Sequence, residues 1–237
     1  MRVAALYDVH GNAPALAAVL DEVEREEPDL VVFGGDLTWG SLPGETLALV
    51  HALEIPARFV RGNADRRVGV ETDGRGPWMT SQHSDEDLRF LAGFEPMVSV
   101  EVDGLGPTCF CHGSPRSDEE CVTEQTPAER VREFMAGVAE RVVVTGHVHL
   151  PYDRDVDGIR LLSPGSVGLQ YGDVPAAYWA LLGPEVEFRR TSYDVDAAVA
   201  AMRATDDPRV ETVVGLMLDP PSRDEVISDA EERVFAG

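Results

Sequence analysis

The chain of 237 residues contains no lysine, and all 20 of its basic residues are arginine. We attribute this absence to genomic base composition and not to mechanism. The 43 acidic residues outnumber the arginines, so the formal net charge is −23. Nucleic-acid binding depends on the neutralisation of phosphates by basic surfaces. A chain this acidic is therefore not expected to bind DNA or RNA.

Cysteine is scarce and long apolar runs are missing. Cys109, Cys111 and Cys121 are too few for a disulfide framework. No apolar run approaches the roughly 20 residues of a membrane-spanning helix. Because Met1-Arg2-Val3 leads at once into an expected strand, no signal peptide is expected either. These absences predict a reduced, cytoplasmic protein without a membrane partner.

Short apolar runs alternate with amphipathic segments in the first half of the chain. Residues 13–26 place Leu16, Val19, Leu20 and Val23 on one helical face. Further helices are expected over residues 44–53 and 85–92 and from Pro127. Strands then predominate after His149, at 152–156, 158–162, 176–182 and 186–190. The alternation predicts an α/β fold over residues 1–192, a four-layer sandwich of two mixed β-sheets flanked by helices.

Two further segments are a loop and a C-terminal extension. Residues 70–84, rich in Gly, Asp, Ser and Thr, are expected to form a loop, where Trp78 and Met79 either pack inward or wall a substrate site. Residues 193–237 are expected to form a helical extension packed on the domain, with helices near 195–202, 211–218 and 224–234. This extension could cover an apolar face, form a homodimer contact or act as a lid.

Polar fragments follow five of the expected strands. The strands are 3–6, 30–33, 59–60, 108–110 and 142–144, and the fragments are Asp8-Val9-His10, Gly35-Asp36, Gly62-Asn63-Ala64-Asp65, Cys111-His112-Gly113 and Gly146-His147-Val148-His149. In open α/β sheets, ligands collect outside the carboxyl ends of the strands. Carboxylate, amide and imidazole groups without thiolate suit manganese, iron(II), zinc or nickel. Seven such groups at one edge would hold two divalent cations.

Simpler interpretations exist for single members of the set. Asp8 could cap the helix that begins near Ala13, and Asp36 could shape a turn. His51 and His83 lie outside the fragments, and we interpret them as surface or core residues.

The ordered set D-x-H, G-D, G-N-x-D, H-G and G-H-x-H resembles the calcineurin-like metallophosphoesterase family, most closely its small bacterial single-domain, phosphodiesterase-like branch. The resemblance spans residues 8–149, and Pro164-Gly165-Ser166-Val167-Gly168 extends it. It implies a pair of divalent ions, manganese first, with iron(II), zinc and nickel as alternatives. The implied ligands are Asp8, His10 and His149 for one ion, Asn63, His112 and His147 for the other, and Asp36 as the bridge.

The resemblance also implies an activity. Two ions about 3.5–4 Å apart can hold a bridging hydroxide for in-line phosphoryl displacement. Asp36 would support that hydroxide, and Asn63 and His112 would help to hold the phosphoryl oxygens or their metal. The expected substrates are small phosphodiesters or activated phosphomonoesters. The alternatives are a phosphomonoesterase acting on phosphoproteins or nucleotides, including dinucleoside polyphosphates, and a non-catalytic metal-bound scaffold.

Ala64 departs from the family pattern. Many members have there a histidine that is assigned the leaving-group proton, and the adjacent acidic residue mainly orients that histidine. Asp65 is therefore a catalytic candidate whose role is open. Arg66 is our candidate for substrate binding, ahead of Arg61, Arg67 and Arg116, because arginine suits phosphate oxygens. Solvent-exposed ion pairing explains these arginines equally well.

Overall fold

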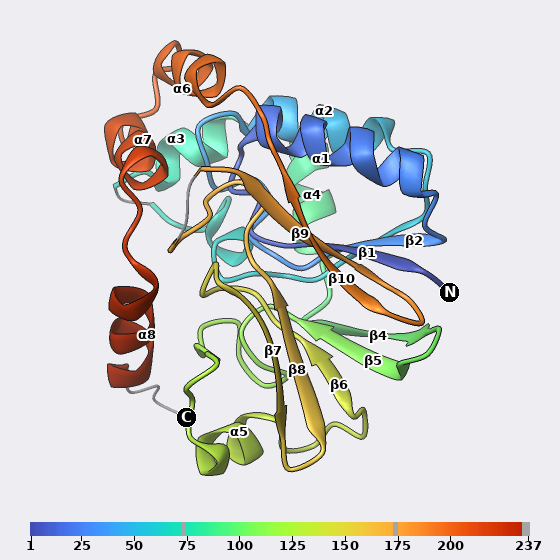
Figure 1. Ribbon diagram of the computed structural model, residues 1–237. Helices are drawn as coiled ribbons and strands as arrows, with labels where there is room; N and C mark the ends of the chain where they lie inside the picture. Colours follow the sequence, from blue (N-terminus) through green and yellow to red (C-terminus); the bar gives the residue numbers. More distant parts are fainter. Residues whose placement is uncertain (73, 173–174, 234–237) are drawn as a thin grey trace.

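The computed structural model describes residues 1–72, 74–172 and 175–233. Within these ranges ten strands form two five-stranded sheets, which lie one above the other in Figure 1. The first sheet has the order β10 (Val186–Thr191), β9 (Ala177–Leu182), β1 (Val3–Leu6), β2 (Leu30–Phe33) and β3 (Ala57–Phe59). The second has the order β4 (Met97–Val102), β5 (Gly106–Cys111), β6 (Val142–Val144), β8 (Ile159–Pro164) and β7 (Pro151–Val156).

Both sheets are mixed, as predicted. In the first sheet β1, β2 and β3 run parallel, whereas β9 pairs antiparallel with both β1 and β10. In the second sheet β5, β6 and β8 run parallel, whereas β4 and β7 are antiparallel edge strands. Asp157 and Gly158 form the hairpin turn that joins β7 to β8, and both residues have positive φ, as a tight hairpin turn requires.

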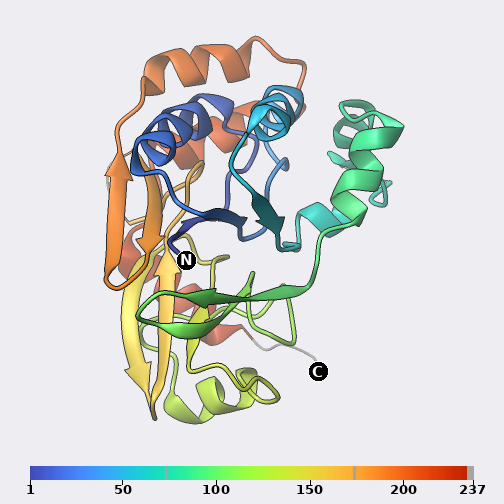
Figure 2. The ribbon, with the colours of Figure 1, turned by 90° about the vertical axis from the view of Figure 1, so that its right-hand side faces the viewer.

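Helices cover the outer faces of the two sheets, and this confirms the four-layer sandwich (Figures 1 and 2). On the first sheet lie α1 (Ala13–Glu26), α2 (Pro43–Ala52) and α4 (Asp85–Ala92), whose apolar residues share a core cluster with β1 and β2. On the second sheet lie α5 (Ala128–Phe134) and α8 (Arg223–Glu232), which share a cluster with β5 and β6. A third cluster fills the space between the sheets.

The first strand explains why the runs before the polar fragments are continuously apolar. Side chains alternate along a strand, so Val3 and Ala5 of β1 face the second sheet while Ala4 and Leu6 face the helices. Both faces of the strand are buried, and a strand buried on both faces is apolar along nearly its whole length. The same alternation places Phe110 of β5 between the sheets.

The expected loop at 70–84 is corrected by the structure, which places a helix within it, α3 (Gly76–Ser81). Pro77 lies in the first turn of this helix. Proline is well tolerated there, because the N–H groups of the first turn have no acceptor within the helix. Met79 is fully buried and Trp78 packs against the same core cluster, so both side chains serve packing. Strand β4 was missed, although its residues alternate strictly between exposed and buried, a period that the sequence displays.

The C-terminal helices pack onto the body of the protein. Helices α6 (Val195–Arg203) and α7 (Val210–Leu218) share a cluster with Ala13, Leu42 and Leu169. A buried ion pair adds a second tie, because the Arg75 guanidinium binds the Asp207 carboxylate, which also accepts a hydrogen bond from Ser41 Oγ at 2.6 Å. Among the described residues, no helix combines the length and apolar character needed to cross a membrane.

Candidate metal centre

The polar fragments meet at one edge of the molecule, where parallel strands of both sheets end. Asp8, Asp36 and Asn63 follow β1, β2 and β3 of the first sheet. His112 follows β5 of the second sheet, and His147 and His149 follow β6. Because the two sheets face each other, residues more than a hundred positions apart in the chain become neighbours at this edge.

The structure gathers six of the candidate ligands into two groups. Asp8, His10 and His149 form one group and Asp36, His112 and His147 the other, and in each group the potential ligand atoms lie within 4.8 Å of one another. The seventh candidate, Asn63, places its Oδ1 3.2 Å from His112 Nε2. The structure thus brings together the same sets that the family resemblance implies, and their role as ligands stays a prediction.

Asp36 lies between the two groups. Its Oδ2 is 3.7 Å from His10 Nε2 in the first group and 3.5 Å from His112 Nε2 in its own. Its other oxygen, Oδ1, accepts a hydrogen bond of 2.8 Å from the Ala64 backbone N–H. One oxygen is therefore fixed by the protein, and the other faces imidazoles of both groups, the position a bridging ligand needs.

Three of the imidazoles are oriented by backbone carbonyls. Nδ1 of His112 donates to Gly34 O at 2.9 Å and Nδ1 of His149 to Leu169 O at 2.6 Å, and a longer contact of 3.4 Å joins Nδ1 of His10 to Trp39 O. A carbonyl only accepts hydrogen bonds, so each Nδ1 carries a proton and Nε2 is the nitrogen left to face the site. Metal-binding histidines in proteins are commonly held through their other ring nitrogen in this way.

The carboxylates at the centre attract positive charge. Among the described side chains Asp8 Oδ1 is buried without a hydrogen-bond partner, yet His149 Nε2 lies 3.3 Å away and His10 Nε2 3.8 Å away. Burial alone would raise the pKa of Asp36, but the neighbouring His112, His10 and His147 hold that pKa well below its usual range. Burial likewise opposes a charge on His112, whereas Asp36 and Asp8 raise the pKa of His112 to about 10. Divalent cations would satisfy this donor set.

Backbone strain concentrates at the same residues. Five of the seven candidate ligands have positive φ, namely Asp8, His10, Asp36, His147 and His149, with φ between 47° and 68°. Residues other than glycine rarely adopt this backbone conformation. It costs of order 1 kcal/mol or more per residue, and such strained residues cluster at functional sites. His147 and His149 thus lie on a turn and not on a continuing strand, so they can point into different groups.

Hydrogen bonds between the loops hold this strained arrangement. Asp8 N donates to Gly35 O at 3.1 Å, and His10 N donates to Asp36 O at 2.9 Å. His147 N donates to Asp8 Oδ2 at 3.1 Å. Gly62 is needed for close approach, since a Cβ there would lie 2.1 Å from Asp36 Oδ1. The loops therefore position the side chains before any ligand binds.

Asp65 has a positioning role in this structure. Its buried carboxylate accepts backbone hydrogen bonds from Asp36 N at 2.8 Å, Leu37 N at 2.9 Å and Gly62 N at 2.8 Å. Burial and the nearby Asp36 carboxylate raise the pKa of Asp65 to about 7. The carboxylate thus ties the Asp36 loop to the Asn63 loop, and its expected catalytic role stays a prediction.

Arg66 forms ion pairs with carboxylates of its own chain. Its guanidinium makes two hydrogen bonds of 3.0 Å to Asp118 and one of 2.7 Å to Glu119. The structure therefore places it in the ion pairing that was the alternative interpretation, and substrate binding by Arg66 stays a prediction. Of the two histidines outside the motifs, His51 is exposed, whereas His83 is buried and bonded to Met79 O and Thr38 Oγ1.

Several residues that shape the site were not singled out from the sequence. Ser166 Oγ donates to Asp8 O at 2.7 Å and accepts from Leu169 N at 2.8 Å, so it links the Asp8 loop to the residue whose carbonyl orients His149. The Pro164–Gly168 motif was the available signal for Ser166. Tyr171 stacks on the His149 ring with 4.6 Å between centroids, and no motif contains it.

We expect Cys111→Ser to leave the number of bound metal ions unchanged. The Cys111 thiol packs with Cys109 and Cys121 in the core cluster of the second sheet, and its Sγ lies 3.8 Å from Val144 O. The thiol therefore sits on the opposite face of the strand end from His112. The buried hydroxyl should still cost about 1–3 kcal/mol of unfolding free energy. Elemental analysis and thermal denaturation measure the two effects, and Cys109→Ser is the matched control. Loss of a metal in Cys111→Ser alone would identify the thiolate as a ligand.

Comparison with known proteins agrees with this geometry. A model of the calcineurin-like phosphoesterase superfamily domain matches residues 1–182. The chain belongs to this superfamily. Members of the superfamily are phosphoesterases that bind divalent metals, and the two ligand groups found here are candidate metal sites of that kind.

Individual relatives match most of the length of this chain. An uncharacterised protein of Methanocaldococcus jannaschii is 25% identical over 225 residues, covering 83% of this chain and 89% of its own. A metallophosphoesterase structure from Sphaerobacter thermophilus has 25% identity and a TM-score of 0.73, covering 91% of this chain and 98% of its own. A hypothetical protein of Pyrococcus horikoshii has the same fold, with 19% identity, a TM-score of 0.78 and coverage of 93% and 99%.

Proposed function

We propose that the protein is a two-metal phosphoesterase that hydrolyses small phosphodiesters or phosphomonoesters with good leaving groups. The observation that carries this proposal is the orientation of the imidazoles. The carbonyls that hold Nδ1 leave Nε2 of His10, His112 and His149 to face the site, and each lies within 4 Å of a buried carboxylate. Three such imidazole nitrogens around Asp8 and Asp36 match the donor set of a divalent cation.

The two groups of candidate ligands support the proposal of one ion in each. Asp8, His10 and His149 would hold one ion, and His112 and His147 would hold the other with the amide oxygen of Asn63. Asp36 Oδ2 would bridge them. When bound, the ions supply a nucleophile from water at neutral pH and neutralise charge on the phosphoryl oxygens. Oxygen and imidazole donors suit manganese first, with iron(II), zinc or nickel also compatible.

The residues beside the site favour substrates with stable leaving groups. Position 64 is alanine, which has no proton to donate, and both Asp65 oxygens are occupied by backbone N–H groups. A leaving group that departs as a stable anion needs no general acid. Nitrophenyl esters and other activated esters should therefore react well.

Three buried free thiols support a reducing compartment, the cytoplasm, as the place where this enzyme acts. We also propose a small phosphate ester as the substrate and a homodimer formed through the C-terminal helices.

Metal reconstitution tests the proposed function. Metal-depleted protein is reloaded with manganese, iron(II), zinc or nickel, one ion at a time, and assayed with diesters, monoesters and nucleotides. Elemental analysis should find close to two ions per chain, and activity should track the second equivalent. Protein that binds no transition metal and gains no activity from manganese would contradict the proposal. Two bound ions without hydrolysis of any ester would support the scaffold alternative instead.

A further inference from the structure

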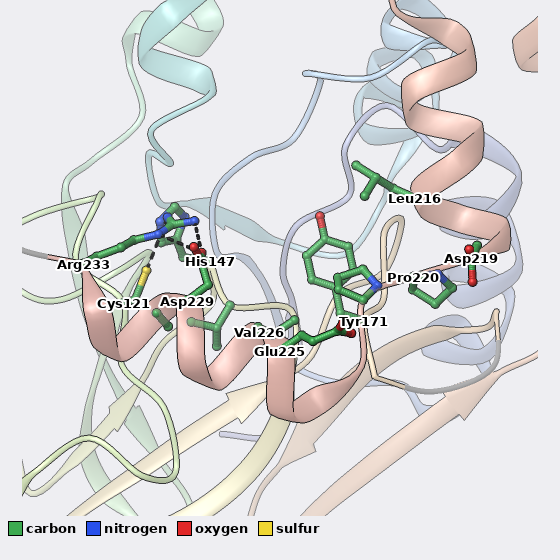
Figure 3. A pocket seen from close by; sticks show the side chains of 13 residues that line it. Cys121, His147, Tyr171, Leu216, Asp219, Pro220, Glu225, Val226, Asp229 and Arg233 are labelled. Atoms are coloured by element: carbon green, nitrogen blue, oxygen red, sulfur yellow. Dashed lines mark hydrogen bonds and ion pairs between the residues drawn. The ribbon is translucent and has the colours of Figure 1, made fainter.

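A cavity of about 690 Å³ adjoins the candidate metal centre (Figure 3). His147, a candidate ligand, lies in its wall, and so does Tyr171, whose ring stacks on His149. The opposite wall comes from the C-terminal extension, through α7, α8 and the turn between them. A cavity of this volume accommodates an organic group of substantial size.

The wall formed by the extension is anchored to the body of the protein. Ile227 and Ala230 of α8 are buried in the core cluster of the second sheet. Arg223, at the start of α8, donates to Pro151 O at 2.9 Å and pairs with Glu124. The cavity is therefore a fixed part of the fold and can select among substrates by shape and charge.

The lining of the cavity is apolar and acidic. Its apolar surface comes from Val148, Tyr171, Leu216, Pro220, Pro221 and Val226. Among the described residues, three carboxylates, Asp219, Glu225 and Asp229, also line it, together with the guanidinium of Arg233, which is bonded to Asp229 at 3.0 Å. Burial raises the pKa of Cys121 to about 11, so this thiol adds no charge at neutral pH.

The charge balance has a consequence for substrates. Glu225 Oε2 accepts the capping bonds of Ser222, at 2.9 Å from its N and 2.7 Å from its Oγ, so the position of this carboxylate is fixed by the helix start. Asp219 is exposed at the end of α7, beside Pro220 (Figure 3). A second phosphate on the substrate would be repelled by these carboxylates, whereas a positive group would be attracted to them.

We propose that this cavity binds the organic substituent of the phosphate ester and selects an apolar substituent that is cationic or neutral, against one that carries a further phosphate. This inference rests on the proposed function and deepens it. It makes the C-terminal extension the specificity element of the enzyme, and it disfavours dinucleoside polyphosphates as substrates. Asp219 is the best position at which to alter the charge of the cavity by substitution, because it is exposed and lies at the end of a helix.

Three p-nitrophenyl phosphodiesters with the same leaving group test the preference. Their second ester group is trimethylammonioethyl, its neutral isostere 3,3-dimethylbutyl, or 2-phosphonoethyl. The expected order of kcat/KM is cationic, then neutral, then anionic, with the extremes differing by on the order of tenfold or more. Asp219→Arg should lower the ratio of cationic to anionic rates by on the order of tenfold, and Asp219→Asn by a smaller factor in the same direction.

The control is Glu54→Arg, an equal charge change at an exposed position that does not line the cavity. It should leave the ratio unchanged. Equal rates for the three esters, or a ratio that responds alike to both arginine variants, would overturn the inference while leaving the phosphoesterase intact. If no ester is hydrolysed, the proposed function fails, and calorimetric binding of hydrolysis-resistant phosphonates with the same three substituents decides the inference by the same order of affinities.

Discussion

Asp36→Asn is expected to lower phosphodiester turnover by about 10³-fold or more and to remove most of the bound metal. Asp36 Oδ2 lies 3.7 Å from His10 Nε2 and 3.5 Å from His112 Nε2, one imidazole from each ligand group. An amide carries no charge to bridge two cations, and metal ions contribute several kcal/mol of transition-state stabilisation, each 1.36 kcal/mol of which is tenfold in rate. The fold should survive, since the amide oxygen can still accept the hydrogen bond from Ala64 N.

The measurements are metal ions per chain by elemental analysis and steady-state turnover with saturating manganese. Asp207→Asn is the matched control, because it makes the same chemical change at another buried carboxylate, one bonded to Ser41 and Arg75. That control should lose stability and keep its metal. An Asp36→Asn protein that retained two ions and half of its turnover would rule out the bridging role.

Ala64→His is expected to accelerate hydrolysis of alkyl monoesters by about 10²–10⁴-fold, the usual contribution of a positioned general acid. Nitrophenyl esters should hardly change, because their leaving groups depart without a proton. The unmodified enzyme should therefore show a steep fall of log turnover with leaving-group pKa, and the variant a shallower one. Ala64 lies beside the candidate ligands, with its backbone N bonded to Asp36 Oδ1 at 2.8 Å.

Ala64→Gln controls for bulk at this buried position, since glutamine fills similar space and is no acid. Its slope should match that of the unmodified enzyme. Metal content must be equal in all three proteins, so that the slopes report on proton transfer alone. A shallow slope in the unmodified enzyme would show that another group already protonates the leaving group, and the expected preference for activated esters would lose its chemical basis.

The sequence was sufficient for the fold class and for the seven candidate ligands that the structure brings to one edge, whose role as ligands stays a prediction. Strands such as β1 are buried on both faces, so their composition is apolar throughout and their ends are visible where Asp8 or Asp36 begins a polar fragment. Burial restricts each such strand to apolar residues, and this restriction can be recognised within the few residues of the strand itself. The same reasoning missed α3, because a six-residue helix that starts at Gly76 and Pro77 has the composition of a loop.

Only the tertiary structure determines which groups orient and surround the site residues. The Nδ1 acceptors of His112 and His149 are the carbonyls of Gly34 and Leu169, and a carbonyl leaves no mark on side-chain composition. Arg66 is held by Asp118 and Glu119, which are more than fifty residues away. The cavity wall formed by Asp219 and α8 depends on where the extension packs. Local patterns report burial and turn preference, whereas these contacts join distant segments, and only the packing of the layers brings such segments together.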